Sequence, residues 1–262
     1  MSGEWINVAA GFLVGVLVGL TGVGGGALMT PILVLMFGMA PSAAVGTDLW
    51  FAAITKMVGG WVHGKKGTID WEVLRRLFLG SIPASLLTLL WLHLTHSDKL
   101  QSVMMIKVLG VVLILTSIAS VFRPYIFAIG KRMRLESPTG FKRWQPMLTV
   151  MGGALIGFLV TFTSIGAGAL GAVILLYLYP LRMSPSTLVG TDIVHAIPLT
   201  VLAGLGHMLM GNVKFDMLGM LLLGSIPGII LGSLGSAYAP EKVVRTAISI
   251  VLVAVGVKML WS

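Results

Sequence analysis

Two carboxylates in apolar surroundings are the side chains most able to do chemistry in this sequence. Asp48 and Asp192 each end a Val-Gly-Thr-Asp sequence that lies several residues inside an apolar run. In a membrane-spanning helix an ionisable group is costly and usually serves a function. A proton relay, hydrogen bonds that gate a substrate, and simple helix-to-helix bonding all stay open for these carboxyls. Thr47 and Thr191 precede them and are equally able to contact a ligand.

Lys56 and His195 lie close to these carboxyls along the chain. Lys56 follows Asp48 by about two helical turns, so the two side chains face a similar direction. A buried lysine could attract an anion or pair with Asp48, whereas a side chain that snorkels to the interface would do neither. His195 follows Asp192 by about one turn, and a titrating Asp–His pair could transfer protons. Lys56, Asp48, Asp192 and His195 are therefore the candidates for coupling to an ion.

Two glycine-rich stretches interrupt long apolar runs. The first is Gly22-Val-Gly-Gly-Gly-Ala-Leu-Met-Thr-Pro31 and the second is Ser164-Ile-Gly-Ala-Gly-Ala-Leu170. Glycine lowers helix stability by roughly 1 kcal/mol per residue relative to alanine, so these stretches predict broken helices. Irregular backbone at membrane depth persists only where protein or a water-filled cavity satisfies its polar groups. Close packing of helices through small residues is the alternative, and the repetition of the break favours a site.

A half-helix that begins at such a break would suit an anion. Its first backbone N–H groups have no partner within the helix, and its dipole is positive at that end. Two breaks that meet near the membrane midplane would direct both ends at one site. The predicted substrate-binding residues are the breaks, their flanking hydroxyls and the Thr-Asp pairs: Thr21, Gly24, Gly25, Gly26, Thr47, Asp48, Thr163, Ser164, Gly166, Gly168, Thr191 and Asp192.

The composition is that of a protein embedded in a membrane. Of the 262 residues 56% are hydrophobic and 10% are charged, and the mean hydropathy is +0.99. Several runs reach the roughly 20 apolar residues that cross about 30 Å of hydrocarbon. Cysteine is absent, which excludes disulfides, thiolate nucleophiles and Cys-ligated metals. The net charge of +9 is concentrated beside apolar runs, so it indicates membrane orientation and no nucleic-acid partner.

The sequence repeats itself. Val45-Gly-Thr-Asp48 recurs as Val189-Gly-Thr-Asp192, and Gly80-Ser-Ile-Pro83 recurs as Gly224-Ser-Ile-Pro227, at one constant offset. The glycine breaks recur at nearly the same offset, so the chain is a duplicated unit. We expect a first transmembrane repeat over 5–123, a basic cytoplasmic linker over 124–145 and a second transmembrane repeat over 146–261.

Charge indicates how the two repeats face the membrane. If each broken run is re-entrant and returns to the side it entered from, a repeat crosses an odd number of times and the second repeat is inverted. If each broken run crosses once, the repeats are parallel. The inverted arrangement leaves more Lys and Arg in the cytoplasm, which the positive-inside rule favours. The residues it places there are Lys65, Lys66, Arg75, Arg76, Arg123, Lys131, Arg132, Arg134, Lys142, Arg143, Arg182, Lys242 and Arg245.

No set of residues supports catalysis or metal binding. The sequence has no Ser-His-Asp arrangement, HExxH or Walker pattern, and its His and Asp residues lack the spacing of metal ligands. We therefore expect no enzyme activity, no cofactor and no metal. The fold expected is an all-α polytopic membrane protein of two homologous, inverted repeats. A secondary carrier is the expected function, with an anion channel as the nearest alternative and a structural subunit or a membrane enzyme as more distant ones.

The order of these motifs resembles one family. Gly22 to Pro31, then Ala44-Val-Gly-Thr-Asp48 and Gly80-Ser-Ile-Pro83, in a duplicated chain, look like the sulfite exporter TauE/SafE family, also called the toluene sulfonate uptake permeases. The resemblance implies a multi-pass plasma-membrane transporter that exports small sulfur-containing or organic anions, such as sulfite and sulfonates. The implied partners are the lipid bilayer and a small anion, and a homo-oligomer stays open. The second break has Ser164 where the first has Gly22, so the two half-sites are expected to bind differently.

Overall fold

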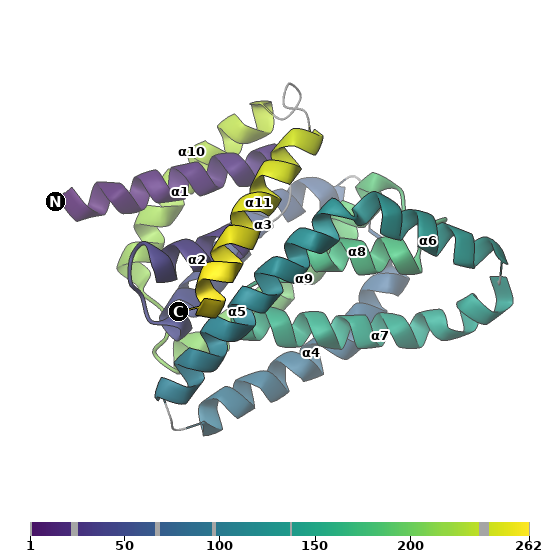
Figure 1. Cartoon of the computed structure of the whole chain (residues 1–262), viewed down its shortest axis with the longest axis horizontal. Helices are drawn as coiled ribbons and strands as arrows, with labels where there is room; N and C mark the ends of the chain where they lie inside the picture. The colour runs from purple at the N-terminus through teal and green to yellow at the C-terminus, as the bar shows by residue number, and fades with distance from the viewer. Residues whose placement is uncertain are drawn as a thin grey trace.

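The computed structural model describes residues 2–21, 26–65, 69–95, 98–136, 138–235 and 241–261, and the regular secondary structure in these ranges is entirely helical (Figure 1). The all-α prediction is thereby confirmed. The helices are α1 (Ser2–Thr21), α2 (Gly26–Leu35), α3 (Pro41–Lys65), α4 (Trp71–Leu94), α5 (Asp98–Val121), α6 (Arg123–Glu136), α7 (Pro138–Thr163), α8 (Ala169–Leu178), α9 (Pro185–Leu209), α10 (Phe215–Gly235) and α11 (Glu241–Trp261).

Six of the described helices are long and apolar enough to cross a membrane, namely α4, α5, α7, α9, α10 and α11. The candidate span of α7, Phe141–Thr163, has 23 residues. At 1.5 Å per residue it extends over about 34 Å, which exceeds the thickness of the hydrocarbon. Helices α2 and α8 have 10 residues each and extend over only about 15 Å. The chain is therefore a multi-pass membrane protein that contains two half-length helices.

Two helix pairs cross at close range between the halves of the chain. Helix α1 lies along α10, and α4 lies along α7 (Figure 1). A Cβ atom added to Gly80 of α4 would lie 1.9 Å from the carbonyl oxygen of Val150, and one added to Gly224 of α10 would lie 1.9 Å from that of Val8. The two backbones touch at these glycines, as is common where membrane helices associate through small residues.

Equivalent contacts recur in the two pairs. Gly15 of α1 packs on the backbone of Ser225, and Gly157 of α7 packs in the same way on Ser81. Helix α3 packs on α9 and α5 on α11, so the most extensive helix pairings each join the first half of the chain to the second. These contacts agree with a duplicated unit. The boundaries expected from the sequence and the inversion of the second repeat stay predictions, and the expected linker over 124–145 contains α6 and the start of α7.

The second broken run, α7 and α8, folds back on itself. Near the start of α7 the side-chain amide of Gln145 donates to the carbonyl oxygen of Leu178, at the end of α8. The hydroxyls of Thr149 and Tyr179 lie 2.7 Å apart at the same level. The run thus returns to the end of the fold at which it began, as the re-entrant alternative requires.

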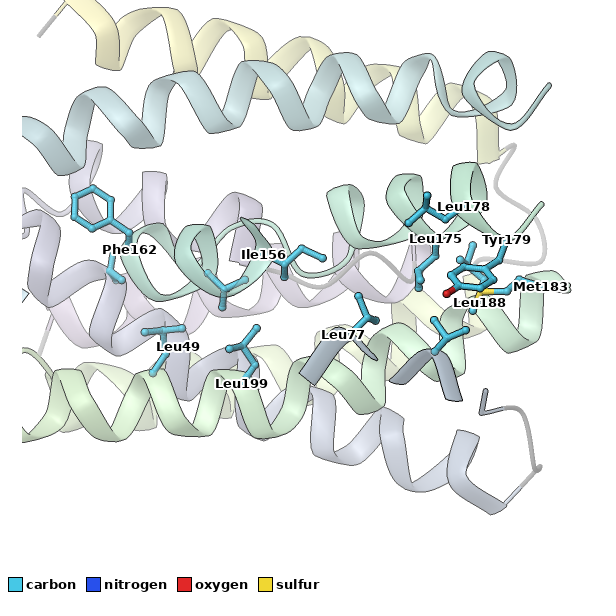
Figure 2. Close-up of a cluster of buried hydrophobic side chains, with 14 of the residues drawn as sticks. Leu49, Leu77, Ile156, Phe162, Leu175, Leu178, Tyr179, Met183, Leu188 and Leu199 are labelled. Atoms are coloured by element: carbon cyan, nitrogen blue, oxygen red, sulfur yellow. The ribbon is translucent and has the colours of Figure 1, made fainter. Parts of the chain in front are cut away.

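Buried apolar side chains hold this hairpin against α3, α4 and α9. Figure 2 shows Leu49 of α3 and Leu199 of α9 near Ile156 and Phe162 of α7, and all four are buried. In lipid, where the surroundings are as apolar as the side chains, such contacts stabilise the fold mainly by close packing. The hairpin is therefore held by the shape of its neighbours, and the break between α7 and α8 lies inside the protein.

The close crossing of α1 and α10 leads to a first prediction. Gly224→Ala places a methyl group against the backbone of α1, so we expect the free energy of unfolding to fall by roughly 1–3 kcal/mol, the usual cost of overpacking. Gly219→Ala is the matched control, because a Cβ at Gly219 of the same helix has no atom within 4 Å. Thermal unfolding of the purified protein in detergent measures both. Equal stability of the two variants would contradict the close contact.

Candidate functional site

The break between α7 and α8 is built by local hydrogen bonds and positive backbone angles. The Thr163 hydroxyl accepts from the backbone N–H of Ile165 at 3.1 Å and donates to the carbonyl oxygen of Leu159 at 2.6 Å. Gly166 and Gly168 have φ angles of 127° and 116°, a region that side chains rarely adopt. Thr163, a predicted ligand residue, therefore satisfies the broken backbone in this structure.

Asp192 of α9 lies against the first turn of the half-helix α8. Its carboxylate faces the backbone amide of Gly168, and a Cβ added to Gly171 would lie 2.3 Å from its Oδ1 atom. Arg123 and Lys56 add favourable charge interactions. Negative charge is favourable at the N-terminus of a helix, so this carboxylate occupies the position that the sequence predicts for an anion. The positive end of α8 thus has an internal partner.

Asp48 of α3 has a poorer set of partners. Its side chain is fully buried, and the Thr30 hydroxyl of α2 donates to Oδ2 at 2.5 Å. Its other oxygen, Oδ1, has no hydrogen-bond partner among the described residues, and neither has the buried hydroxyl of Ser164. Ser164 is the next polar group beside the carboxyl and has a φ angle of 60°, which non-glycine residues adopt rarely. Asp48 of the first half therefore lies next to the break of the second half.

Lys56 links the two carboxylates electrostatically. It interacts with Asp192 more strongly than with Asp48, and its side chain is half-buried. The salt bridges found among the described residues do not include Lys56, so it acts over a distance rather than through a direct ion pair. Three of the four predicted coupling residues, Asp48, Lys56 and Asp192, are thus brought together.

The fourth, His195, has a different neighbour from the one its spacing predicts. Its Nε2 atom lies 2.9 Å from the Ser81 hydroxyl of α4, and its ring packs against Phe78. About three turns further along α9, His207 Nε2 lies 2.9 Å from the carbonyl oxygen of Thr161. Both histidines therefore connect α9 to neighbouring helices, and His195 is hydrogen-bonded to Ser81 rather than to Asp192.

The predicted residues Thr47 and Thr191 make a matched pair of contacts. The Thr47 hydroxyl accepts from the backbone N–H of Lys214 at 3.1 Å, and the Thr191 hydroxyl accepts from that of Asp70 at 3.0 Å. Lys214 and Asp70 each precede a long helix, α10 or α4, in the half of the chain opposite to the threonine. In this structure both hydroxyls fasten one half to the other, and their role as ligand residues stays a prediction.

The first glycine break falls mainly outside the described residues. Gly24 and Gly25 are not among them, and the side chain of Thr21 is also outside the description; α1 ends at Thr21 and α2 begins at Gly26. The predicted role of these four residues in binding therefore stays a prediction. In both halves a 10-residue helix follows a longer one, α2 after α1 and α8 after α7.

A cavity of about 60 Å³ lies where the two half-helices begin. Ala27 and Leu28 of α2 line it from one side and Ala169 of α8 from another, so both half-helix N-termini reach the same space. The volume is that of about two water molecules, which suits a small ion. Its polar side chains come from α5, α6 and α11, and are Thr116, Ser120, Arg123, Arg245 and Ser249.

These five polar residues are missed by sequence reasoning. Arg123 and Arg245 are assigned above only to membrane orientation, yet both are half-buried and line the cavity. Arginine is the side chain best suited to oxyanions, because its planar fork presents several donors. A hydroxyl-rich stretch near the end of α5, including Thr116 and Ser120 beside Arg123, is the one signal in the sequence that could have found them.

A cluster of charged groups closes the end of the fold where the α7–α8 hairpin begins and ends. Arg182, in the loop after α8, contacts Asp70 Oδ2 at 2.6 Å and Glu72 Oε2 at 2.7 Å. Burial lowers the pKa of Arg182, but its hydrogen bonds with Glu72 and Asp70 raise the pKa further, so it ends above the ordinary value. The guanidinium therefore stays charged and joins the hairpin loop to α4.

Comparison with known proteins gives a consistent result. The sequence profile described as "Sulfite exporter TauE/SafE" matches residues 7–259. The chain is 39% identical to the "Probable membrane transporter protein YjnA" of Bacillus subtilis, over 97% of this chain and 98% of that protein. It is 26% identical to the "Probable membrane transporter protein YdhB" of the same organism, over 95% of this chain and 97% of that protein. No solved structure matches the chain.

The contact between Thr47 and Lys214 leads to a second prediction. Thr47→Val leaves the backbone N–H of Lys214 without its partner, so we expect the free energy of unfolding to fall by roughly 1–3 kcal/mol. Thr55→Val in the same helix is the control, because the Thr55 hydroxyl donates only to carbonyl groups of its own helix; its effect should stay within about 0.5 kcal/mol. Unfolding in detergent measures both. Unchanged stability of Thr47→Val would contradict this structural role and leave ligand contact as the role predicted for Thr47.

Proposed function

Because this chain belongs to the sulfite exporter TauE/SafE family of membrane transporters, we propose that it is a secondary carrier that exports small sulfur-containing or organic anions, such as sulfite and sulfonates. The membrane that it crosses would be the plasma membrane. The cavity at the two half-helix N-termini is the single observation that supports this function most strongly.

The chemistry of the cavity suits an oxyanion. Arg123 and Arg245 supply positive charge and fork-shaped donors, and the hydroxyls of Thr116, Ser120 and Ser249 add neutral donors. Helix α2 also begins beside this space and adds the positive end of its dipole, whereas the corresponding end of α8 has Asp192 as its partner. Low surrounding polarity strengthens each of these interactions relative to water. A small anion with several oxygen atoms would use all of them.

Transport without chemical conversion is the form of activity we propose. Export of an anion from a cell with a negative interior is favoured by roughly 2.3 kcal/mol per charge per 100 mV. Alternating access would come from movement of one repeat against the other around a fixed site, as in other transporters built from inverted repeats. No nucleotide-binding pattern occurs in the sequence, so this gradient or an ion gradient would supply the energy.

Counterflow in proteoliposomes tests the function. Vesicles loaded with unlabelled sulfite should take up labelled sulfite in exchange, and the exchange should saturate as sulfite is increased. Sulfate, thiosulfate and methanesulfonate, tested as competitors, define the range of anions. An ohmic current without exchange would identify a channel, and no flux of any of these anions would reject the proposal.

The two arginines lead to a third prediction. Arg245→Gln removes a charged donor from the cavity, and a hydrogen bond to a charged group contributes about 1.5–3 kcal/mol. We therefore expect sulfite affinity to fall roughly 10- to 100-fold. Arg143→Gln is the matched control, because Arg143 is exposed at the start of α7 and lies outside the cavity lining. Equal affinities of the two variants for sulfite would place the anion elsewhere.

A further inference from the structure

Asp48 is a buried carboxyl that the proposed anion site does not use. It is absent from the lining of the cavity, has Thr30 as a donor through its hydroxyl and its backbone amide, and leaves Oδ1 without a hydrogen-bond partner among the described residues. A buried ionised carboxylate normally accepts several hydrogen bonds or pairs with a cation. The surroundings of Asp48 therefore fit a neutral carboxylic acid better than a carboxylate.

The balance of charge around the two aspartates points the same way. Asp192 has Lys56, the Gly168 amide and Arg123 around it, whereas Asp48 has the hydroxyl and amide of Thr30, the Ser164 hydroxyl and the charge of Lys56. Lys56 is shared between the two carboxyls and interacts more strongly with Asp192, so Asp48 receives the smaller share of positive charge. A proton on Asp48 removes the negative charge that is less well compensated, while Asp192 keeps its cations.

We propose that Asp48 is a proton-binding site that couples the anion transport proposed above to the movement of one proton. In this step a proton from water binds Oδ1 of the carboxylate, and the new O–H group can donate to the Ser164 hydroxyl oxygen. A metal cation fits less well, because sites for hard cations use about six oxygen ligands. Only the oxygens of Asp48, Thr30 and Ser164 are found together here, and Lys56 would repel a cation.

Ser164 connects this proton to the anion site. It belongs to the break that leads into α8, and the N-terminus of α8 lines the anion cavity. A protonated Asp48 tolerates the described position of Ser164. An ionised Asp48 needs further donors, so Ser164 must move toward it or water must enter. The two protonation states therefore favour different positions of the break, and proton binding shifts the balance between them.

The other charged groups on the elements around Asp48 do not replace this role. On α9, Asp192 and His195 interact with Lys56, and His195 is held by Ser81. Lys214 and Asp216, near the start of α10, are exposed. On α5, the Lys107 ammonium donates to the carbonyl oxygen of Leu260. α2 presents the hydroxyl and the backbone amide of Thr30 to the carboxyl, and the break presents the Ser164 hydroxyl, so Asp48 is the group expected to titrate.

Sulfite flux against a pH gradient tests the coupling. With the membrane potential clamped at zero, wild-type proteoliposomes should accumulate sulfite, and a gradient of one pH unit sustains about a tenfold ratio per coupled proton. Asp48→Asn should lose this accumulation but keep sulfite counterflow. Asp216→Asn, the control at an exposed carboxyl, should behave as the wild type, and protein-free vesicles report leakage. Accumulation by Asp48→Asn, or accumulation driven by a sodium gradient instead, would overturn the proposal.

Infrared difference spectra on changing pH test the proton site without any anion. The carbonyl band of a protonated carboxylic acid should be present in the wild type and in Asp216→Asn, and absent in Asp48→Asn. In Ser164→Ala the ionised form loses a donor, so the midpoint of this band should move up by roughly one pH unit or more. A band that survives in Asp48→Asn, or one whose midpoint is unchanged in Ser164→Ala, would overturn the assignment. If the band behaves as expected but wild-type protein moves no anion, the carrier proposal fails and the proton site stands.

Discussion

A polypeptide that breaks its helix inside a membrane must still satisfy every amide and carbonyl group there, and the rest of this structure follows from that requirement. The described break meets it with its own Thr163 hydroxyl and with the carboxylate of Asp192 from α9. The break is packed on two sides: Ala167 lies against the cluster that includes α3, α4 and α9, and Ile165 packs with side chains of α5 and α11. An interrupted helix is thus tolerated because other helices surround it, and the same enclosure creates polar space at its end.

The scaffold is closely symmetric, whereas the site is not. The glycine crossings of α1 with α10 and of α4 with α7 use equivalent residues, and so do the hydroxyl contacts of Thr47 and Thr191. The two aspartates, by contrast, have different neighbours. Asp192 has a helix terminus and two cations, whereas Asp48 has two hydroxyls, the Thr30 amide and the weaker influence of Lys56. A duplicated frame can hold two carboxyls at related positions while each acquires a separate role from its surroundings.

The sequence predicts what is local and repeated, and it misses what depends on distant contacts. The helix break at Gly166 and Gly168 follows from glycine itself, and the importance of Asp48 follows from a charge in an apolar run. The partner of His195 could not be derived from spacing, because Ser81 lies more than a hundred residues earlier in the chain. From the sequence, Arg123 and Arg245 are predicted only to be interfacial charges, for the same reason. They reach one cavity because α5, which ends just before Arg123, packs against α11, which contains Arg245.

The pattern of contacts also indicates which parts can move together. Helices α3 and α9, which carry the two aspartates, are joined by the bond from Trp50 Nε1 to the carbonyl oxygen of Gly204 at 3.1 Å. A Cβ added to Gly46 would lie 2.1 Å from the carbonyl oxygen of Asn212, so α3 also touches the end of the α9 segment directly. These ties hold the carboxyls in one body. The break is tied to its own α7 through Thr163 and to α9 through the contact of Asp192 with the Gly168 amide. A shift of the hairpin against the α3–α9 pair would therefore change the surroundings of both carboxyls, of Asp48 at Ser164 and of Asp192 at Gly168.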